Sequence, residues 1–255
     1  MVEKWLDVID KAAGFLLTPL AYRDFLRLYG LTFSNRRLVR ELVHLQPHRP
    51  WFRTRNFSTI LDVGAFIGTY AFAMKHILPD AQVYSFEPLP ASFAALSATM
   101  QPFPDWQGFH TALGDTTGSL EFWENEFSAS SSALPMEDLH RQTFPQTKAS
   151  HQVTVPVTTM DEMTPQLTLN GPVLLKIDVQ GYEMAVLRGA KNLLRQIDCV
   201  VCEVSYYPLY RDQSLFPEVY EFMKEAGFTY KGSLENLVAP ANGNIMQSDA
   251  VFMRQ

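Results

Sequence analysis

One stretch decides the expected fold: Leu61-Asp62-Val63-Gly64-Ala65-Phe66-Ile67-Gly68-Thr69-Tyr70. It lies between a short apolar run and a segment with helical spacing, so it predicts a strand that turns directly into a helix. Gly64 permits a turn that a Cβ would forbid and allows a ligand to approach the backbone, while Gly68 lets the start of the helix pack tightly on the sheet. Asp62, the acid before the turn, suits a cationic ligand with an ammonium group.

The same loop argues against phosphate binding. A dinucleotide site normally has the pattern Gly-x-Gly-x-x-Gly, and the middle glycine is missing here. A P-loop ends in Gly-Lys-Ser/Thr, whereas this loop ends in Gly68-Thr69-Tyr70. The loop therefore indicates a ligand site at a strand end without a phosphate cradle.

Strands and helices alternate on both sides of this loop. Strands are predicted at residues 58–63, 82–87, 106–113, 173–178 and 197–203, and helices at 68–77, 90–100, from 178 through Leu194, and at about 215–226. Such alternation implies a parallel, doubly wound α/β sheet. The last segments, 227–230 and 249–253, are predicted to form a closing antiparallel pair.

The middle of the chain departs from that rhythm. Residues 119–123 alternate like an antiparallel strand, residues 128–132 form a loop of small residues, and a further strand is expected to end at Val157. Insertions between core units often carry substrate-binding elements.

The first 50 residues are expected to form a separate helical segment. Helical spacing runs from residue 3 to about 46, and Gln46-Pro47-His48-Arg49-Pro50 is interpreted as a linker. We expect residues 1–50 to pack on a domain formed by residues 51–255, with a lid or a homodimer contact as alternatives. A membrane-surface helix is disfavoured, since the first helix carries few basic residues.

Composition excludes several classes of protein. The chain has 255 residues, 47% of them hydrophobic, and a formal net charge of −6, which argues against a nucleic-acid partner. Neither a signal peptide nor an apolar run of about 20 residues that could span a membrane is apparent. Cys199 and Cys202 lie in an apolar run and are expected to be unpaired core thiols rather than a redox or zinc site, which suits the cytoplasm.

Four acids are expected at one edge of the sheet, because Asp62, Glu87, Asp178 and Glu203 lie at or just beyond predicted strand ends. Carboxylates there are costly to bury without partners, so they indicate a polar ligand site. Glu87 follows the loop by about 20 residues, where an acid can bind both hydroxyls of a ribose. Ala112-Leu113-Gly114-Asp115 could contact an adenine ring or form an ordinary turn.

Two further fragments carry a family resemblance: Leu175-Lys176-Ile177-Asp178-Val179-Gln180-Gly181-Tyr182-Glu183 and the following Val186-Leu187-Arg188-Gly189-Ala190. With the loop, Phe86-Glu87-Pro88 and the Asp249-Ala250-Val251-Phe252 ending, the chain resembles the FkbM-type family of S-adenosylmethionine (SAM)-dependent methyltransferases over roughly residues 58–254. The resemblance implies a Rossmann-like class I methyltransferase sheet whose last strand is antiparallel. It also implies methyl transfer from SAM, usually to a hydroxyl of a sugar or secondary metabolite.

The resemblance also assigns roles to individual residues. The loop would line the methionine part of SAM, Glu87 the ribose, and Ala112 and Leu113 the adenine, with Asp178 beside the transferred methyl. Gln180 stands where the family commonly has Glu, so a base or metal ligand would be lost there; we interpret it as a residue behind the site. The predicted cofactor-binding residues are Asp62, Gly64, Ala65, Gly68, Thr69, Tyr70, Glu87, Pro88, Ala112, Leu113 and Asp178.

A hydroxyl acceptor must lose its proton, so a base is expected within hydrogen-bond reach. Asp178 is the first candidate, with Glu203 and His151 after it; Asp178 and Glu203 could instead hold Mg²⁺. Lys176 and Glu183 are expected to form a structural pair. Three tyrosines in the segment 205–210 could form an aromatic wall for a sugar ring or simply pack.

Two other functions stay open at this stage. A nucleotide-dependent oxidoreductase could use a similar sheet, although the missing glycine counts against it. A catalytically inactive SAM-binding module is the other, and Gln180 keeps it open. The expected partner is a small hydroxyl acceptor, namely a sugar, glycolipid or secondary metabolite.

Overall fold

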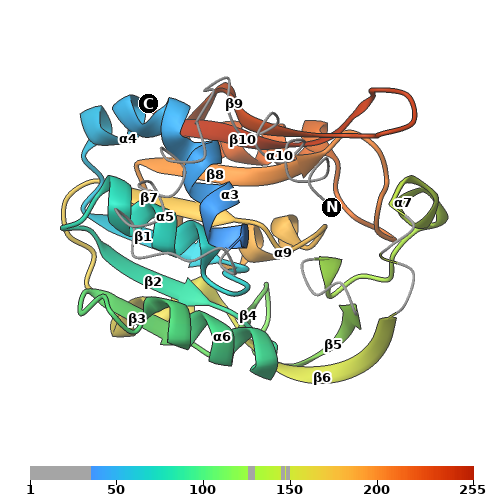
Figure 1. The fold of residues 1–255 in the computed structure, drawn as a ribbon, viewed down its shortest axis with the longest axis horizontal. Helices are drawn as coiled ribbons and strands as arrows, with labels where there is room; N and C mark the ends of the chain where they lie inside the picture. The colour runs from blue at the N-terminus through green and yellow to red at the C-terminus, as the bar shows by residue number, and fades with distance from the viewer. Residues whose placement is uncertain (1–35, 126–129, 145–146, 148–149) are drawn as a thin grey trace.

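A computed structural model describes residues 36–125, 130–144, 147 and 150–255. A seven-stranded sheet in the order β3-β2-β1-β7-β8-β10-β9 forms its centre (Figure 1). The expected α/β sheet is confirmed: β1, β2, β3, β7 and β8 run parallel, and β10 pairs antiparallel with both β8 and β9. The strands are β1 Thr59–Val63, β2 Gln82–Phe86, β3 Trp106–Phe109, β7 Val173–Ile177, β8 Cys199–Ser205, β9 Phe228–Val238 and β10 Ile245–Arg254.

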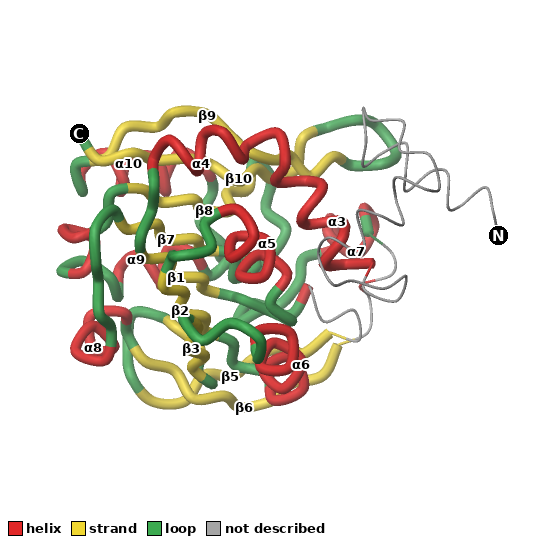
Figure 2. The backbone as a smooth tube through the Cα atoms, turned by 60° about the vertical axis from the view of Figure 1, so that its left-hand side comes forward, coloured by secondary structure: helices red, strands yellow, loops and turns green. Residues whose placement is uncertain are grey.

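Helices cover both faces of this sheet. Figure 2 shows α5 and α6 on one side of the strands and α8, α9 and α10 on the other, and Phe52 of α4 packs in the same cluster as α5. Successive side chains of a strand point to opposite faces, so Ile60 packs in the cluster with α5 while Leu61 and Val63 pack in the cluster with α9. The helices are α3 Arg36–Leu45, α4 Arg49–Arg55, α5 Thr69–Ile77, α6 Pro90–Met100, α7 Asp138–Thr143, α8 Met160–Met163, α9 Glu183–Arg188 and α10 Phe216–Glu225, with 3-10 turns η1 Gln46–His48, η4 Thr164–Gln166 and η5 Leu193–Gln196.

The insertion in the middle forms a second sheet, β4-β6-β5. β5 (Gly118–Asn125) pairs antiparallel with β6 (Ser150–Thr158), as the alternation predicted. The predicted single strand 106–113 is wrong, because the chain leaves the first sheet after Phe109 and β4 (Ala112–Leu113) pairs with β6. The hydroxyl of Thr111 donates to the carbonyl of Pro156 at this crossing.

Two predicted segments differ in their helical content. The helix expected through Leu194 ends at Arg188, and Asp161 accepts hydrogen bonds from the backbone N–H groups of Asn192 and Leu193 at the start of η5. The segment interpreted as a linker is helical, in η1 and the start of α4. Its prolines lie in the first turn of each helix, where the missing N–H leaves no bond unmade.

Helix α3 packs directly on the sheet domain. Leu38, Val39 and Leu42 are buried in the same apolar cluster as α5. The helices expected between residues 3 and 35 lie outside the described residues, and the domain boundary after residue 50 stays a prediction. None of the helices in the described part of the chain is both long and apolar enough to cross a bilayer.

Candidate active site

A cavity of about 630 Å³ lies beyond the carboxyl ends of β1, β2, β7 and β8. The loop after β1, the acids after β2 and β7, and parts of α3, β10 and the insertion line it. Most predicted site residues meet here, and three do not: Asp62, Gly68 and His151. Those that line the cavity are Gly64, Ala65, Thr69, Tyr70, Glu87, Pro88, Ala112, Leu113, Asp178 and Glu203.

Gly64 brings the loop after β1 against the loop after β7. Its φ is +80°, and a Cβ at this position would lie 1.9 Å from the carbonyl oxygen of Asp178. The backbone N–H groups of Gly64 and Ala65 both donate to the carbonyl of Phe86, each at 3.1 Å. The predicted ligand loop and the predicted base are therefore in direct contact.

Gly68 is needed for a different contact from the one expected. A Cβ there would lie 2.9 Å from the Cδ1 of Leu96, which belongs to α6. This glycine therefore allows α5 and α6 to approach each other, rather than packing the start of α5 on the sheet.

Asp62 is fully buried beside Lys176 and does not reach the cavity wall. Burial raises the pKa of Asp62 to about 6, although Lys176 acts to lower it. Neither carboxylate oxygen of Asp62 has a hydrogen-bond partner of good geometry among the described residues, although the backbone N–H of Ala71 also favours its charged form.

Lys176 is the cation at the centre of this acidic region. Its Nζ donates to Oδ2 of Asp178 at 3.0 Å and lies 5.3 Å from the centre of the Tyr70 ring. Burial acts to lower the pKa of Lys176, but Asp178, Asp62 and Asp249 outweigh it and raise the pKa well above its usual value. The expected pairing of Lys176 with Glu183 is wrong: one oxygen of Glu183 accepts the backbone N–H groups of Val179 and Gly181, both at 3.0 Å.

Glu87 ties the cofactor loop to the end of β2. Its two oxygens accept the backbone N–H groups of Phe66 and Leu89, each at 2.9 Å. Burial raises the pKa of Glu87 to about 7, and these two hydrogen bonds act to lower it. The carboxyl group therefore titrates near neutral pH at the cavity wall.

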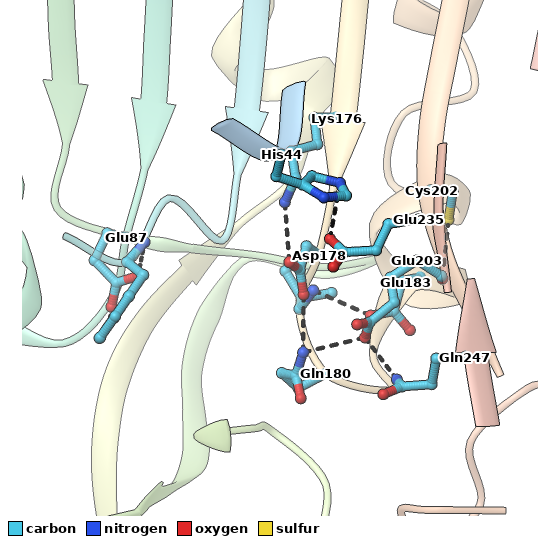
Figure 3. Close-up of polar contacts among 12 residues, drawn as sticks. His44, Glu87, Lys176, Asp178, Gln180, Glu183, Cys202, Glu203, Glu235 and Gln247 are labelled. Atoms are coloured by element: carbon cyan, nitrogen blue, oxygen red, sulfur yellow. Dashed lines mark hydrogen bonds and ion pairs between the residues drawn. The ribbon is translucent and has the colours of Figure 1, made fainter. Parts of the chain in front are cut away.

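The side chain of Gln180 joins Asp178 and Glu203 (Figure 3). Its Nε2 donates to Oδ1 of Asp178 at 2.9 Å and to Oε2 of Glu203 at 3.1 Å. Gln247 on β10 donates to the same Glu203 oxygen at 2.7 Å. Burial, followed by the charges of Asp178 and Glu183, raises the pKa of Glu203 well above its usual value.

Neither His151 nor the three tyrosines of the segment 205–210 line the cavity. His151 lies on β6, where its Nε2 is 3.2 Å from Oε2 of Glu124, and it does not line the cavity. Tyr206 and Tyr207 are exposed, and neither contributes to the cavity lining. Tyr210 is buried and donates to Oε1 of Gln180 at 2.9 Å.

Several residues that line the cavity were not predicted from the sequence, and two of them are titratable groups with shifted pKa values. Asp249 lies opposite Glu203 in the antiparallel pair of β10 and β8, and burial raises its pKa to about 7. The sequence signal for Asp249 was an acidic residue next to the apolar run near the end of the chain, which is unusual for a buried strand. His140 on α7 is buried, its Nδ1 has no hydrogen-bond partner among the described residues, and burial lowers its pKa to about 4. Nothing in its spacing marks it.

The side-chain chemistry does not support the alternative in which Asp178 and Glu203 hold Mg²⁺. Among the described residues, no group of three His, Cys, Asp or Glu side chains is arranged to hold a metal ion. An amide N–H₂, which a cation cannot use as a ligand, lies between Asp178 and Glu203 instead. Cys199 and Cys202 are buried free thiols, as expected.

Comparisons with known proteins identify the family of this chain. The FkbM domain of methyltransferases matches residues 62–230. The 2-O-methyltransferase NoeI of Sinorhizobium fredii is 26% identical over 60% of this chain and 66% of its own length. Methyltransferase 1 of Beauveria bassiana is 31% identical over 52% of this chain and 58% of its own length. The hexuronic acid methyltransferase AglP of Haloferax volcanii is 27% identical over 58% of this chain and 56% of its own length.

The matched part spans less than two thirds of the length of each of these relatives. The structure of a TehB-like SAM-dependent methyltransferase from Corynebacterium glutamicum matches 92% of this chain and 94% of its own length at 14% identity, with a TM-score of 0.44. The family match covers most of the chain and includes the loop, Glu87 and the Asp178 segment. This chain therefore belongs to the FkbM methyltransferase family.

Proposed function

We propose that this chain is a SAM-dependent O-methyltransferase that acts on a hydroxyl group of a sugar or a related small molecule. One observation carries the proposal: the glycine loop after β1 and Asp178 line a single cavity, and Gly64 lies against the backbone carbonyl of Asp178. A cofactor in the loop would thereby have its reactive end beside an acid that can accept a proton.

The residues present fit SAM. Gly64 exposes backbone to the cavity without a side chain, and Glu87 lines the wall at a strand end, where a ribose can bind. Ala112 and Leu113 add an apolar surface for adenine. The lining holds six acids and three basic side chains, and above neutral pH this excess of acids favours a cationic ligand. Asp62 and Gly68 support the loop from behind in this proposal.

When bound, SAM supplies a methyl group on a positively charged sulfonium. Asp178 holds the acceptor hydroxyl and takes its proton as the oxygen forms the new bond. Its two oxygens already accept from Lys176 and Gln180, but each retains a further lone pair for the hydroxyl. Most of the rate gain comes from holding the acceptor oxygen in line, which the rigid contacts of Asp178 provide.

The acceptor side of the cavity is formed by the insertion. Leu120, Phe122 and Ser131 line it together with His140. This mixture of apolar and hydrogen-bonding groups suits a sugar ring, and two relatives are named for a 2-O position and for a hexuronic acid. A carbohydrate hydroxyl is therefore the first acceptor class to test.

Calorimetric titration with SAM and with its demethylated product S-adenosylhomocysteine (SAH) tests the cofactor, and a panel of sugars with labelled SAM tests the transfer. The proposal expects binding of both ligands and turnover of at least one hydroxyl acceptor. Absence of SAH binding by folded protein would overturn it. Binding without any turnover would favour the inactive module, and binding of a nicotinamide nucleotide instead would favour the oxidoreductase.

Mg²⁺ takes no part in this proposal, because the amide of Gln180 lies between the acids that would hold it. A homodimer, a cytoplasmic location and the absence of a nucleic-acid partner stay predictions.

A further inference from the structure

The side chain of Gln180 has an unusually complete set of partners. A primary amide carries two N–H groups, and each of them has a carboxylate oxygen to donate to, on Asp178 at 2.9 Å and on Glu203 at 3.1 Å. Its oxygen accepts the hydroxyl of Tyr210 at 2.9 Å. Turning the amide over would place its oxygen against both carboxylates, so the network fixes its orientation.

The backbone of Gln180 is held as firmly as its side chain. Its φ is +55°, an uncommon conformation for a residue with a Cβ. The neighbouring N–H groups of Val179 and Gly181 both donate to Glu183, and Ser132 donates to the carbonyl of Gln180 at 2.6 Å. A Cβ on Gly181 would lie 3.0 Å from the Tyr210 ring, so that ring packs tightly on the turn.

The charges around Gln180 explain why a donor is needed there. Asp178 and Glu203 approach the same amide, with Glu183 and Asp249 adding further negative charge to the region. Lys176 hydrogen-bonds to Asp178, whereas the described partners of Glu203 are the neutral amides of Gln180 and Gln247. Partly buried carboxylates that lie close together require a proton, a cation or hydrogen-bond donors between them.

We propose that Gln180 is a positioning residue whose side-chain amide fills the place of a bridging cation between Asp178 and Glu203. The amide holds the two carboxylates at a fixed separation without a metal ion, and Tyr210 and Ser132 hold the amide. This inference rests on the proposed function, in which Asp178 is the proton acceptor. It also gives Gln180 a role other than the loss of a catalytic group.

A near-isosteric substitution tests the inference directly. Gln180→Glu keeps the shape but replaces both donors by a third carboxylate, which creates an oxygen-rich site for a divalent cation. We expect Q180E to bind Mg²⁺ or Ca²⁺ with a Kd of ~1 mM or below, at least about tenfold tighter than wild type, by calorimetry. Gln107→Glu is the matched control, because it adds the same charge at an exposed position of the edge strand β3.

A second variant covers the case in which Q180E folds poorly. Gln180→Met keeps the length of the side chain and has neither donor nor charge. In buffer with a chelator, we expect Tm to fall in the order wild type, Q180M, Q180E, because only the last adds like charge. A hundredfold excess of cation over its Kd should then raise the Tm of Q180E by about 5–10 °C and leave Q180M and Q107E unchanged.

Two results would overturn the inference. One is cation binding by Q180E that is no tighter than that of Q107E; the other is equal Tm values for Q180E and Q180M with and without cation. SAH binding by the wild type is measured alongside. Its absence would overturn the proposed function, whereas the cation titrations alone decide the role of Gln180.

Discussion

Glu87→Gln offers the sharpest test of the cofactor site, because the structure predicts a large loss of ligand binding and little change in stability. Glu87 lines the cavity at the end of β2 and is proposed to bind the ribose hydroxyls. A hydrogen bond to a charged group contributes ~1.5–3 kcal/mol, so the loss of the charge should weaken SAH binding by about 10- to 150-fold at pH 8.

The stability of the protein should change much less. The pKa of Glu87 is raised from 4.5 to about 7 by burial, so keeping it ionised above pH 7 lowers stability by ~3 kcal/mol. Because the pKa of Glu87 is higher in the folded than in the unfolded protein, its protonated form contributes stability that is fully present below pH 4.5. This contribution is lost as the pH rises through about 7. Gln removes that penalty but gives up one of the two backbone hydrogen bonds, at ~1–3 kcal/mol, so the two effects nearly cancel at pH 8.

The pH dependence of binding provides the second readout. With a pKa of about 7, Glu87 is ionised in about one tenth of molecules at pH 6 and about nine tenths at pH 8. Wild-type SAH affinity should therefore rise up to about tenfold between these pH values, and Glu87→Gln should abolish that part of the rise.

Calorimetry at both pH values measures the affinity, and urea unfolding measures the stability. The control is Glu225→Gln, an exposed position on α10 outside the cavity. An SAH affinity that Glu87→Gln leaves within twofold of wild type at pH 8 would refute the ribose assignment.

Three further predictions concern the loop, the base and the core. Gly64→Ala should unfold at a lower urea concentration than Gly243→Ala, because both glycines have a φ near +80° but only at Gly64 does a neighbour, the Asp178 carbonyl, occupy the place of the Cβ. The two variants should differ by more than ~1 kcal/mol in the free energy of unfolding. An equal loss of stability in both would contradict the close approach of Gly64 to Asp178. Asp178→Asn should lower the rate of methyl transfer about 10²- to 10⁴-fold while SAH still binds. The control Asp80→Asn, at an exposed position, should change neither the rate nor SAH binding. A fully active Asp178→Asn enzyme would exclude Asp178 as the base. Burial raises the pKa of Cys199 to about 12, so this thiol should react with a thiol reagent only as fast as the protein unfolds. Fast labelling of Cys199 in the native protein would show that β8 is not buried.

The sequence predicts the main sheet well because its strands and helices differ in period and length. The loop from β1 to α5 was located to within a residue, since the apolar run and the glycines mark both of its ends. The division of residues 106–113 between two sheets could not be predicted. It depends on β6, whose Pro156 accepts from Thr111 more than 40 residues away in sequence.

The candidate site was predicted in part for a similar reason. Glu87 and Asp178 come one residue after β2 and β7 end, so they face the cavity as expected. Asp62 lies inside β1, one residue before its end, and its side chain is buried against the sheet instead. A shift of one residue decides which face a strand residue points to, and the sequence does not locate strand ends that closely.

The role of Gln180 could not be decided from the family resemblance, because it depends on contacts with distant parts of the chain. In the sequence, a glutamine in place of a glutamate is equally compatible with a lost catalytic group and with a residue that fits its surroundings. The two differ in what other parts of the chain provide. Ser132 in the insertion and Tyr210 after β8 bind Gln180, and Gln247 on β10 donates to the acid that Gln180 contacts. These three residues lie outside the segment 175–183 that carries the family signature, and an inactive site has no physical need for such a match. The completeness of this network therefore argues for a working acid pair in which an amide replaces a charge.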